Sequence, residues 1–271
     1  MTRLSIPALA LLLAAAAATP TPSTAQEAAT PAVNSALQAA VADPGRDAAQ
    51  RARDRYRHPA ETLAFFGLKP TDTVIEISPG SGWYSAILAP YLRDRGRYIA
   101  ASATPAPGRS SPLPALFAAD ASRYGRASLH WYDGKSPSLG APASADTVLT
   151  FRNVHNWVAA GTADTYFQAL FAALKPGGTL GVVDHRAKPG TDLETMKKSG
   201  YLTEALVIDL ATRAGFVLDA RSEVNANPAD SADHPNGVWT LPPTNRHDAT
   251  DAEKYRAIGE SDRMTLRFRK P

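Results

Sequence analysis

The chain has 271 residues, of which 44% are hydrophobic and 20% are charged. This is the composition of a globular protein, because disordered chains carry fewer apolar residues and a larger net charge. The 29 basic and 26 acidic residues nearly balance and give no indication of nucleic-acid binding, while the absence of cysteine excludes disulfides, thiolate metal sites and a cysteine nucleophile.

The first 25 residues predict a secretory signal peptide. Arg3 provides a positive charge, an apolar run rich in leucine and alanine extends from Leu4 to Ala18, and residues 23–25 form a small-x-small cleavage site. The apolar run is shorter than the roughly 20 residues that a membrane-spanning helix needs, so an uncleaved anchor is the less favoured alternative. We therefore expect an exported, periplasmic protein that has no membrane span after cleavage.

Residues 26–58 are expected to form an N-terminal extension that is first disordered and then helical, with helices over 35–41 and 47–57. The remaining chain, 59–271, is expected to form one domain, because no linker or internal repeat divides it. A proline-rich stretch at 225–262 predicts a cap-like insertion before the last strand.

Within this domain, short β-branched runs alternate with amphipathic segments. The alternation predicts a doubly wound, Rossmann-like α/β fold with a mostly parallel, seven-stranded sheet and an antiparallel last strand. Helices are expected at 60–66, 85–92, 114–124, 163–174 and 201–214, and strands at 73–77, 97–101, 127–132, 146–151, 179–184, 216–222 and 264–269.

The first strand of the sheet ends in a glycine-containing turn, Glu76-Ile77-Ser78-Pro79-Gly80-Ser81-Gly82, before a helix begins near Ser85. Open α/β sheets bind ligands at this edge, where glycines let a ligand approach the backbone. The third glycine of a dinucleotide-binding loop is replaced by Ser85, and no P-loop lysine follows. The turn therefore predicts a small-ligand site of another kind.

Several blocks in chain order resemble the class I S-adenosylmethionine-dependent methyltransferases. The turn at Glu76 resembles the acidic-x-Gly-x-Gly-x-Gly loop of that family, and Phe151–Trp157 resembles a motif of an exported bacterial group of predicted methyltransferases. The other blocks are Asp133 after the third strand, Ser144–Leu149, Leu174–Leu180 with its Lys-Pro-Gly-Gly turn, and Ala214-Gly215-Phe216.

The resemblance implies S-adenosylmethionine as the cofactor. The residues that it places at the cofactor are Glu76, Ser78, Gly80, Gly82, Ser102, Asp133, Arg152 and Trp157. Two positions depart from the family pattern. Ser78 replaces the first glycine of the loop, and Ser102 replaces the acid that binds both ribose hydroxyls. A hydroxyl cannot form the charge-assisted pair, so we expect weaker cofactor binding.

Two histidines follow strands at the edge where the ligand is expected, His155 after the fourth strand and His185 after the fifth. His155, with Asn153 beside it, is the favoured general base or acceptor-orienting residue, although packing beneath a helix is an equal alternative. His155, Asp184 and His185 have the chemistry of metal ligands, but no tight spacing supports such a site, and no metal is expected.

The sequence thus predicts methyl transfer from S-adenosylmethionine to an unidentified acceptor, either a small molecule or an exported macromolecule. The alternative is a non-catalytic exported binding protein on the same fold, because fold does not imply function. We expect no nucleic-acid partner, and the oligomeric state stays open.

Overall fold

The structure is a computed structural model that describes residues 1, 2 and 32–271. The predicted signal peptide, apart from its first two residues, and the start of the extension lie outside the described residues. Among the residues described, no helix is both long enough and apolar enough to span a bilayer.

The predicted seven-stranded sheet is confirmed, with the strand order β3-β2-β1-β4-β5-β7-β6. The strands β1 to β5 pair in parallel, and β7 runs antiparallel to both of its neighbours. The strands are β1 (Thr73–Ile77), β2 (Arg97–Ala103), β3 (Ser128–Tyr132), β4 (Ala145–Phe151), β5 (Leu174–His185), β6 (Val217–Ser222) and β7 (Arg263–Arg269).

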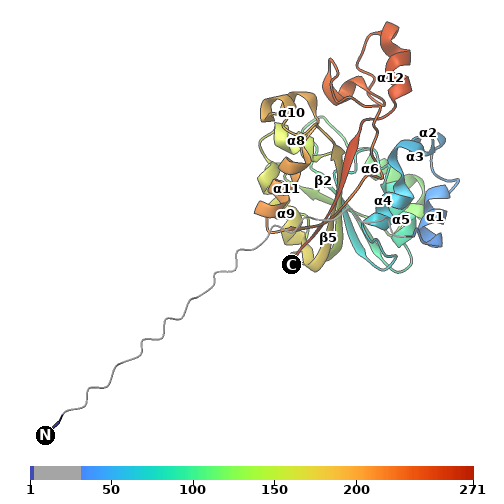
Figure 1. Cartoon of the computed structure of the whole chain (residues 1–271). Helices are drawn as coiled ribbons and strands as arrows, with labels where there is room; N and C mark the ends of the chain where they lie inside the picture. Colours follow the sequence, from blue (N-terminus) through green and yellow to red (C-terminus); the bar gives the residue numbers. More distant parts are fainter. Residues whose placement is uncertain (3–31) are drawn as a thin grey trace.

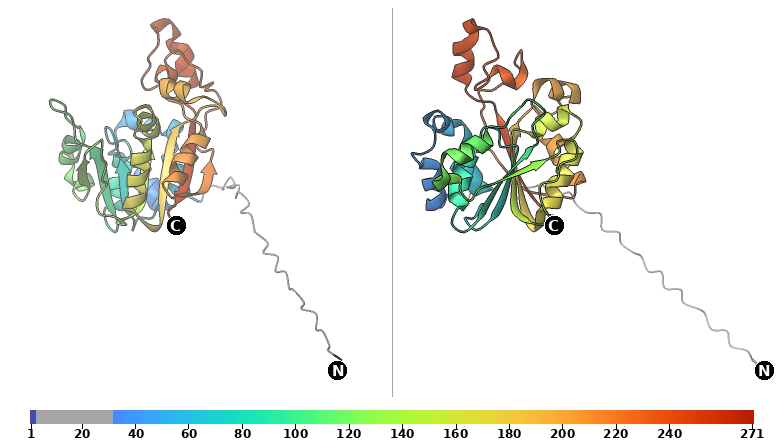
Figure 2. Two further views of the ribbon diagram at one scale, coloured as in Figure 1. Left: turned by 90° about the vertical axis from the view of Figure 1, so that its left-hand side faces the viewer. Right: turned by 180° about the vertical axis from the view of Figure 1, so that it is seen from behind.

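Helices cover both faces of the sheet (Figures 1 and 2). One face carries α1 (Ser35–Ala42), α2 (Ala48–Arg51), α3 (Asp54–Arg57), α4 (Pro59–Phe65), α5 (Ser85–Leu92), α6 (Leu113–Ala119) and α7 (Ala121–Tyr124). The other carries α8 (Val154–Ala159), α9 (Ala163–Ala173), α10 (Leu193–Ser199) and α11 (Glu204–Arg213). A separate hydrophobic cluster lies under each layer.

The single helix expected over 47–57 is wrong, because two short helices, α2 and α3, occupy this stretch. The break between them allows Asp54 to accept two hydrogen bonds from the buried guanidinium of Arg46, at 2.7 and 2.8 Å. Other contacts hold the extension on the domain, such as the hydrogen bond from the Trp83 indole to the Gln50 carbonyl at 3.1 Å.

The long helix expected over 201–214 is also wrong at its start. Gly200, with a φ of 75°, ends the unpredicted helix α10, and the Thr203 side chain accepts a hydrogen bond from the Leu206 amide to begin α11. The short helix α8 was not predicted either. It follows β4 directly and places His155 and Trp157 on its buried side.

Residues 225–262 rise above the carboxyl edge of the sheet and contain η1 (Gly237–Thr240), η2 (Ala249–Asp251) and α12 (Ala252–Ile258), as Figure 1 shows. The two ends of this segment lie together. The Asn227 amide donates hydrogen bonds to the carbonyl oxygens of Ile258 and Glu260, at 2.9 and 2.7 Å. We call residues 225–262 the cap segment.

Candidate functional site

A cavity of about 270 Å³ lies at the carboxyl edge of the sheet, between the β1–α5 loop and the cap segment. Its lining comes from six separate parts of the chain, so only the complete fold forms it. The lining residues are Arg53, Arg57, Glu76, Ser78, Pro79, Gly80, Ser81, Trp83, Tyr84, Phe151, Arg152, Asn153, His155, His185, Val238, Trp239, Pro242, Pro243, Thr244 and Arg263.

The β1–α5 loop supplies backbone to this cavity. Ser78, Gly80 and Gly82 all have positive φ, at 53°, 63° and 84°. A Cβ added at Gly80 would meet no atom within 4 Å, whereas a Cβ at Gly82 would collide with the Leu116 side chain. The backbone at Gly80 is therefore open to a ligand, and the space beside Gly82 is filled by α6.

Glu76, near the end of β1, is only 2% exposed. Its carboxylate accepts hydrogen bonds from the hydroxyls of Tyr98, at 2.5 Å, and Ser85, at 3.4 Å. Burial raises the pKa of Glu76 to about 7, although both hydrogen bonds favour the charged form. The group thus changes charge near neutral pH at the floor of the cavity.

Replacing Glu76 by glutamine is expected to stabilise the protein at pH 8 by on the order of 2 kcal/mol. The raised pKa means that the folded state holds a proton that the unfolded state has lost between pH 4.5 and 7, so stability falls as the pH rises through this window. Urea denaturation at pH 5 and pH 8 measures the effect. The exposed Glu61→Gln variant is the control, and a gain of equal size at both pH values would contradict the charge-based explanation.

His155 and Asp184 form a buried pair at the ends of β4 and β5. The His155 Nδ1 lies 2.8 Å from one oxygen of the Asp184 carboxylate, and the His155 amide donates to the other oxygen at 3.2 Å. The His185 amide also donates to this carboxylate, at 2.8 Å. With Nδ1–H bound to Asp184, the His155 Nε2 is an acceptor, which is the arrangement of a general base.

His185 lies beside this pair, with its ring 5.0 Å from the His155 ring. Its Nδ1 lies 2.6 Å from the Ser261 hydroxyl. Burial, the neighbouring His155 and nearby arginines lower the pKa of His185 well below its usual range. The ring is thus neutral at physiological pH and offers a hydrogen-bonding nitrogen without a charge.

Four arginines, from three distant parts of the chain, line the same cavity: Arg53, Arg57, Arg152 and Arg263. A single buried carboxylate, Glu260, forms ion pairs with Arg53 at 2.6 Å and Arg57 at 3.0 Å, and also with Arg263. We call these four arginines the arginine cluster. Of these four arginines, the sequence predicted only Arg152 as a site residue, because the four have no regular spacing along the chain.

The cavity brings together six of the ten residues predicted for the site. These are Glu76, Ser78, Gly80, Arg152, Asn153 and His155. The Asn153 amide donates to the carbonyl of Ile77 at 3.1 Å, so it also joins the ends of β1 and β4. Their roles toward a cofactor or acceptor stay predictions.

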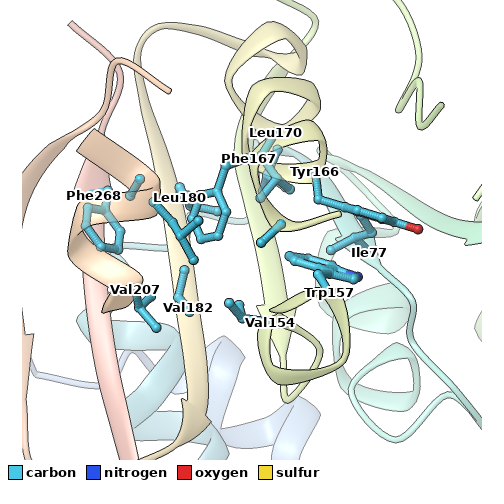
Figure 3. Packing of buried hydrophobic residues seen from close by; sticks show 14 of the residues in the cluster. Ile77, Val154, Trp157, Tyr166, Phe167, Leu170, Leu180, Val182, Val207 and Phe268 are labelled. Atoms are coloured by element: carbon cyan, nitrogen blue, oxygen red, sulfur yellow. The ribbon is translucent and has the colours of Figure 1, made fainter. Parts of the chain in front are cut away.

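The other four predicted residues are not among the lining residues of the cavity. Gly82 is next to it in the loop, Ser102 and Asp133 are at least partly accessible at the ends of β2 and β3, and Trp157 is buried in the core. Figure 3 shows Trp157 packed beside Tyr166, and the two rings are stacked with centroids 4.4 Å apart. Trp157 thus packs in the hydrophobic core against α9 and does not line the cavity.

His155, Asp184 and His185 lie close enough to share a metal ion, since their ligand atoms are within 4.8 Å of one another. The Asp184 carboxylate already accepts three hydrogen bonds. The positive charges of Arg263, Arg152 and Arg57 act on His185 and oppose a divalent cation at the same place. The electrostatics of the site therefore favour an anion over a metal ion.

No family model matches the chain. No curated protein matches it either. Among solved structures, it is similar to a SAM-dependent methyltransferase from Aquifex aeolicus, with 15% identity and a TM-score of 0.53 over 81% of this chain and 93% of that chain. It is also similar to the [4+2]-cyclase SpnF, with 17% identity and a TM-score of 0.56 over 87% of this chain and 91% of the other.

These similarities establish the Rossmann-like fold that methyltransferases use. At such low identity they establish the fold alone. One of the two similar structures is a cyclase, which illustrates that this architecture carries more than one reaction. The function therefore depends on the residues in the cavity and not on the fold alone.

Proposed function

We propose that the protein transfers a methyl group from S-adenosylmethionine to an acceptor bound under the cap segment. The observation that carries this proposal is the position of His155, which pairs with the buried Asp184 and lines the same cavity as the open backbone at Gly80. A positioned base beside a ligand-binding loop is what removal of a proton from a methyl acceptor requires. We further propose that residues 1–25 direct export to the periplasm.

The polar groups at the carboxyl edge of the sheet match part of what binding of S-adenosylmethionine requires. The β1–α5 loop offers exposed backbone at Gly80, and Asp133 supplies an accessible carboxylate at the end of β3. Ser102, at the end of β2, offers one hydroxyl where a carboxylate would bind two ribose hydroxyls. We expect the loss of one charge-assisted contact to cost about 1.5–3 kcal/mol of affinity, which weakens binding without abolishing it.

When bound, the cofactor supplies an electrophilic methyl group on a sulfonium. The residues of this chain then orient the acceptor and accept its proton. His155 Nε2 takes the proton from an acceptor hydroxyl or ammonium, and Asp184 holds the ring in the required tautomer and stabilises the resulting imidazolium. Trp239 of the cap segment, with its ring 6.2 Å from that of His155, helps to exclude water.

The direct test is calorimetric titration of the full chain with S-adenosylmethionine and S-adenosylhomocysteine. We expect micromolar binding of both. Absence of binding at millimolar concentration would contradict the proposal and would favour a non-catalytic binding protein on this fold.

A matched pair of glycine variants localises the binding site. Gly80 and Gly67 both have positive φ, and an added Cβ meets no atom within 4 Å at either position. Gly80→Ala and Gly67→Ala should therefore lose a similar stability, about 1–2 kcal/mol. Only Gly80 lines the cavity. We expect Gly80→Ala to weaken cofactor binding at least about tenfold, and Gly67→Ala to leave it unchanged. Equal affinity of the two variants would place the cofactor elsewhere.

A further inference from the structure

The arginine cluster contains more positive charge than the carboxylates around it neutralise. Glu260 forms ion pairs with the other three arginines of the cluster but not with Arg152, which lines the cavity. Arg57 and Arg263 are only 4% and 2% exposed, yet the Nη2 of Arg57 and the Nε of Arg263 have no partner among the described residues. The same holds for Nη2 of Arg53. Buried donors without partners are unfavourable, and an anion in the cavity that these arginines line would offset part of the cost of burying their charge.

The backbone at Arg152 is also strained. Its φ is 61°, in the left-handed region that side chains other than glycine rarely adopt. Strain of this kind persists where the surrounding structure holds a residue in place, and it is common at ligand sites. Burial, and then the repulsion from Arg263, lowers the pKa of Arg152 to about 10. Burial and the repulsion from Arg152 lower that of Arg57 to about 9.

The position of the cluster separates it from the part of the edge that the cofactor would occupy. Arg152 follows β4, and Arg263 begins β7, with β5 and His185 between them in the sheet. The ends of β2 and β3, with Ser102 and Asp133, lie on the other side of β1. The cluster is therefore on the acceptor side of the cavity, under the cap segment and next to His155.

We propose that the arginine cluster binds a phosphate group on the methyl acceptor, so that the substrate is a phosphorylated compound. Guanidinium groups bind phosphate oxygens in a planar, bidentate manner. Glu260 holds three of the guanidiniums from behind and does not line the cavity, which leaves the cavity side of the cluster free for the ligand. The identification of the acceptor side rests on the proposed methyl transfer, but the anion site does not.

The test uses inorganic phosphate as the probe, titrated into the full chain by calorimetry. We expect saturable binding that Arg152→Gln weakens roughly 10- to 100-fold. Arg95→Gln is the matched control, because Arg95 is exposed and precedes β2 at the opposite edge of the sheet. Arg152→Gln should not lower the thermal unfolding temperature, because burial and repulsion from Arg263 outweigh the attraction of Arg152 to Glu260 and Asp184. A loss of stability without a loss of phosphate affinity would make Arg152 a structural residue and overturn the proposal.

Competition with the cofactor product distinguishes the two possible sources of the anionic group. If phosphate and S-adenosylhomocysteine bind together, the cluster serves the acceptor, as proposed. If S-adenosylhomocysteine displaces phosphate, the cluster binds the carboxylate of the cofactor and the acceptor assignment is wrong. Failure of phosphate to bind at about 10 mM, which means a dissociation constant well above the millimolar range, overturns the anion site. Phosphate binding without binding of either cofactor form leaves the anion site intact and contradicts methyl transfer.

Discussion

Replacement of His155 by alanine is expected to slow methyl transfer by about 10²- to 10⁴-fold. The His155 Nε2 is the only nitrogen of the His155–Asp184 pair left to accept a proton, because Nδ1 is bound to the carboxylate at 2.8 Å. The affinity for S-adenosylmethionine should stay within about twofold, since a proton acceptor acts on the chemical step. The measurement is the rate of S-adenosylhomocysteine formation with an acceptor that the wild type methylates, together with calorimetric cofactor affinity.

A second histidine–aspartate pair provides the control. His234 of the cap segment binds the buried Asp230 at 2.8 Å, the same distance as in the first pair, but neither residue lines the cavity. His234→Ala should lower stability while leaving the turnover of the folded protein near that of the wild type. Equal loss of turnover in the two variants, or full activity of His155→Ala, would mean that His155 only packs beneath the cap segment.

Replacement of Glu260 by glutamine is expected to destabilise the fold by roughly 3–5 kcal/mol. Glu260 is 2% exposed and pairs with three arginines, so its loss leaves several buried positive charges without compensation. Urea denaturation at pH 7 gives the free energy of unfolding. Glu223→Gln is the matched control, because Glu223 pairs with Arg186 at 2.7 Å while half exposed, and such pairs contribute about 1 kcal/mol or less.

The same residue gives a pH dependence of defined sign. Burial favours the neutral form of Glu260, but the charges of Arg263 and Arg57 prevail and lower its pKa to about 2 from an ordinary 4.5. The stabilisation is complete above pH 4.5 and is lost as the pH falls toward 2, an effect of about 3 kcal/mol. Wild-type protein should lose stability in this window more steeply than Glu260→Gln. If the free energies of unfolding of the two proteins fell in parallel with pH, the lowered pKa would not belong to Glu260.

The positions of the apolar strands in the sequence predicted most of the fold. Short β-branched runs such as Thr73–Ile77 are typical of strands buried on both faces of a parallel sheet, here with Glu76 as the one charged residue. Helix boundaries were less predictable. Gly200 ends α10 and the Thr203 cap begins α11, whereas the predicted helix began between them, at 201.

The sequence predicted residues of the candidate site only where a polar or titratable side chain lies at or just after the end of a strand. Glu76, Asn153 and His155 follow or end strands, and parallel strands bring such residues to one edge. The arginine cluster depends on α3 and the start of β7, which are far apart in the sequence and come together only through the N-terminal extension and the cap segment. The spacing of these arginines in the sequence therefore does not predict that they lie close together.

The cap segment leaves the sheet after β6 and returns to β7 at nearly the same point, held there by Asn227 and by the hydrogen bond from the Arg263 amide to the Asn225 carbonyl. A segment whose ends already meet can be shortened, lengthened or exchanged at little entropic cost, because loop closure depends only weakly on length. His155 and the arginine cluster belong to the sheet edge and the extension, whereas Val238, Trp239, Pro242 and Pro243 belong to the cap segment. Changes in the middle of the cap segment can therefore alter the lining of the cavity while His155 and the arginine cluster stay in place.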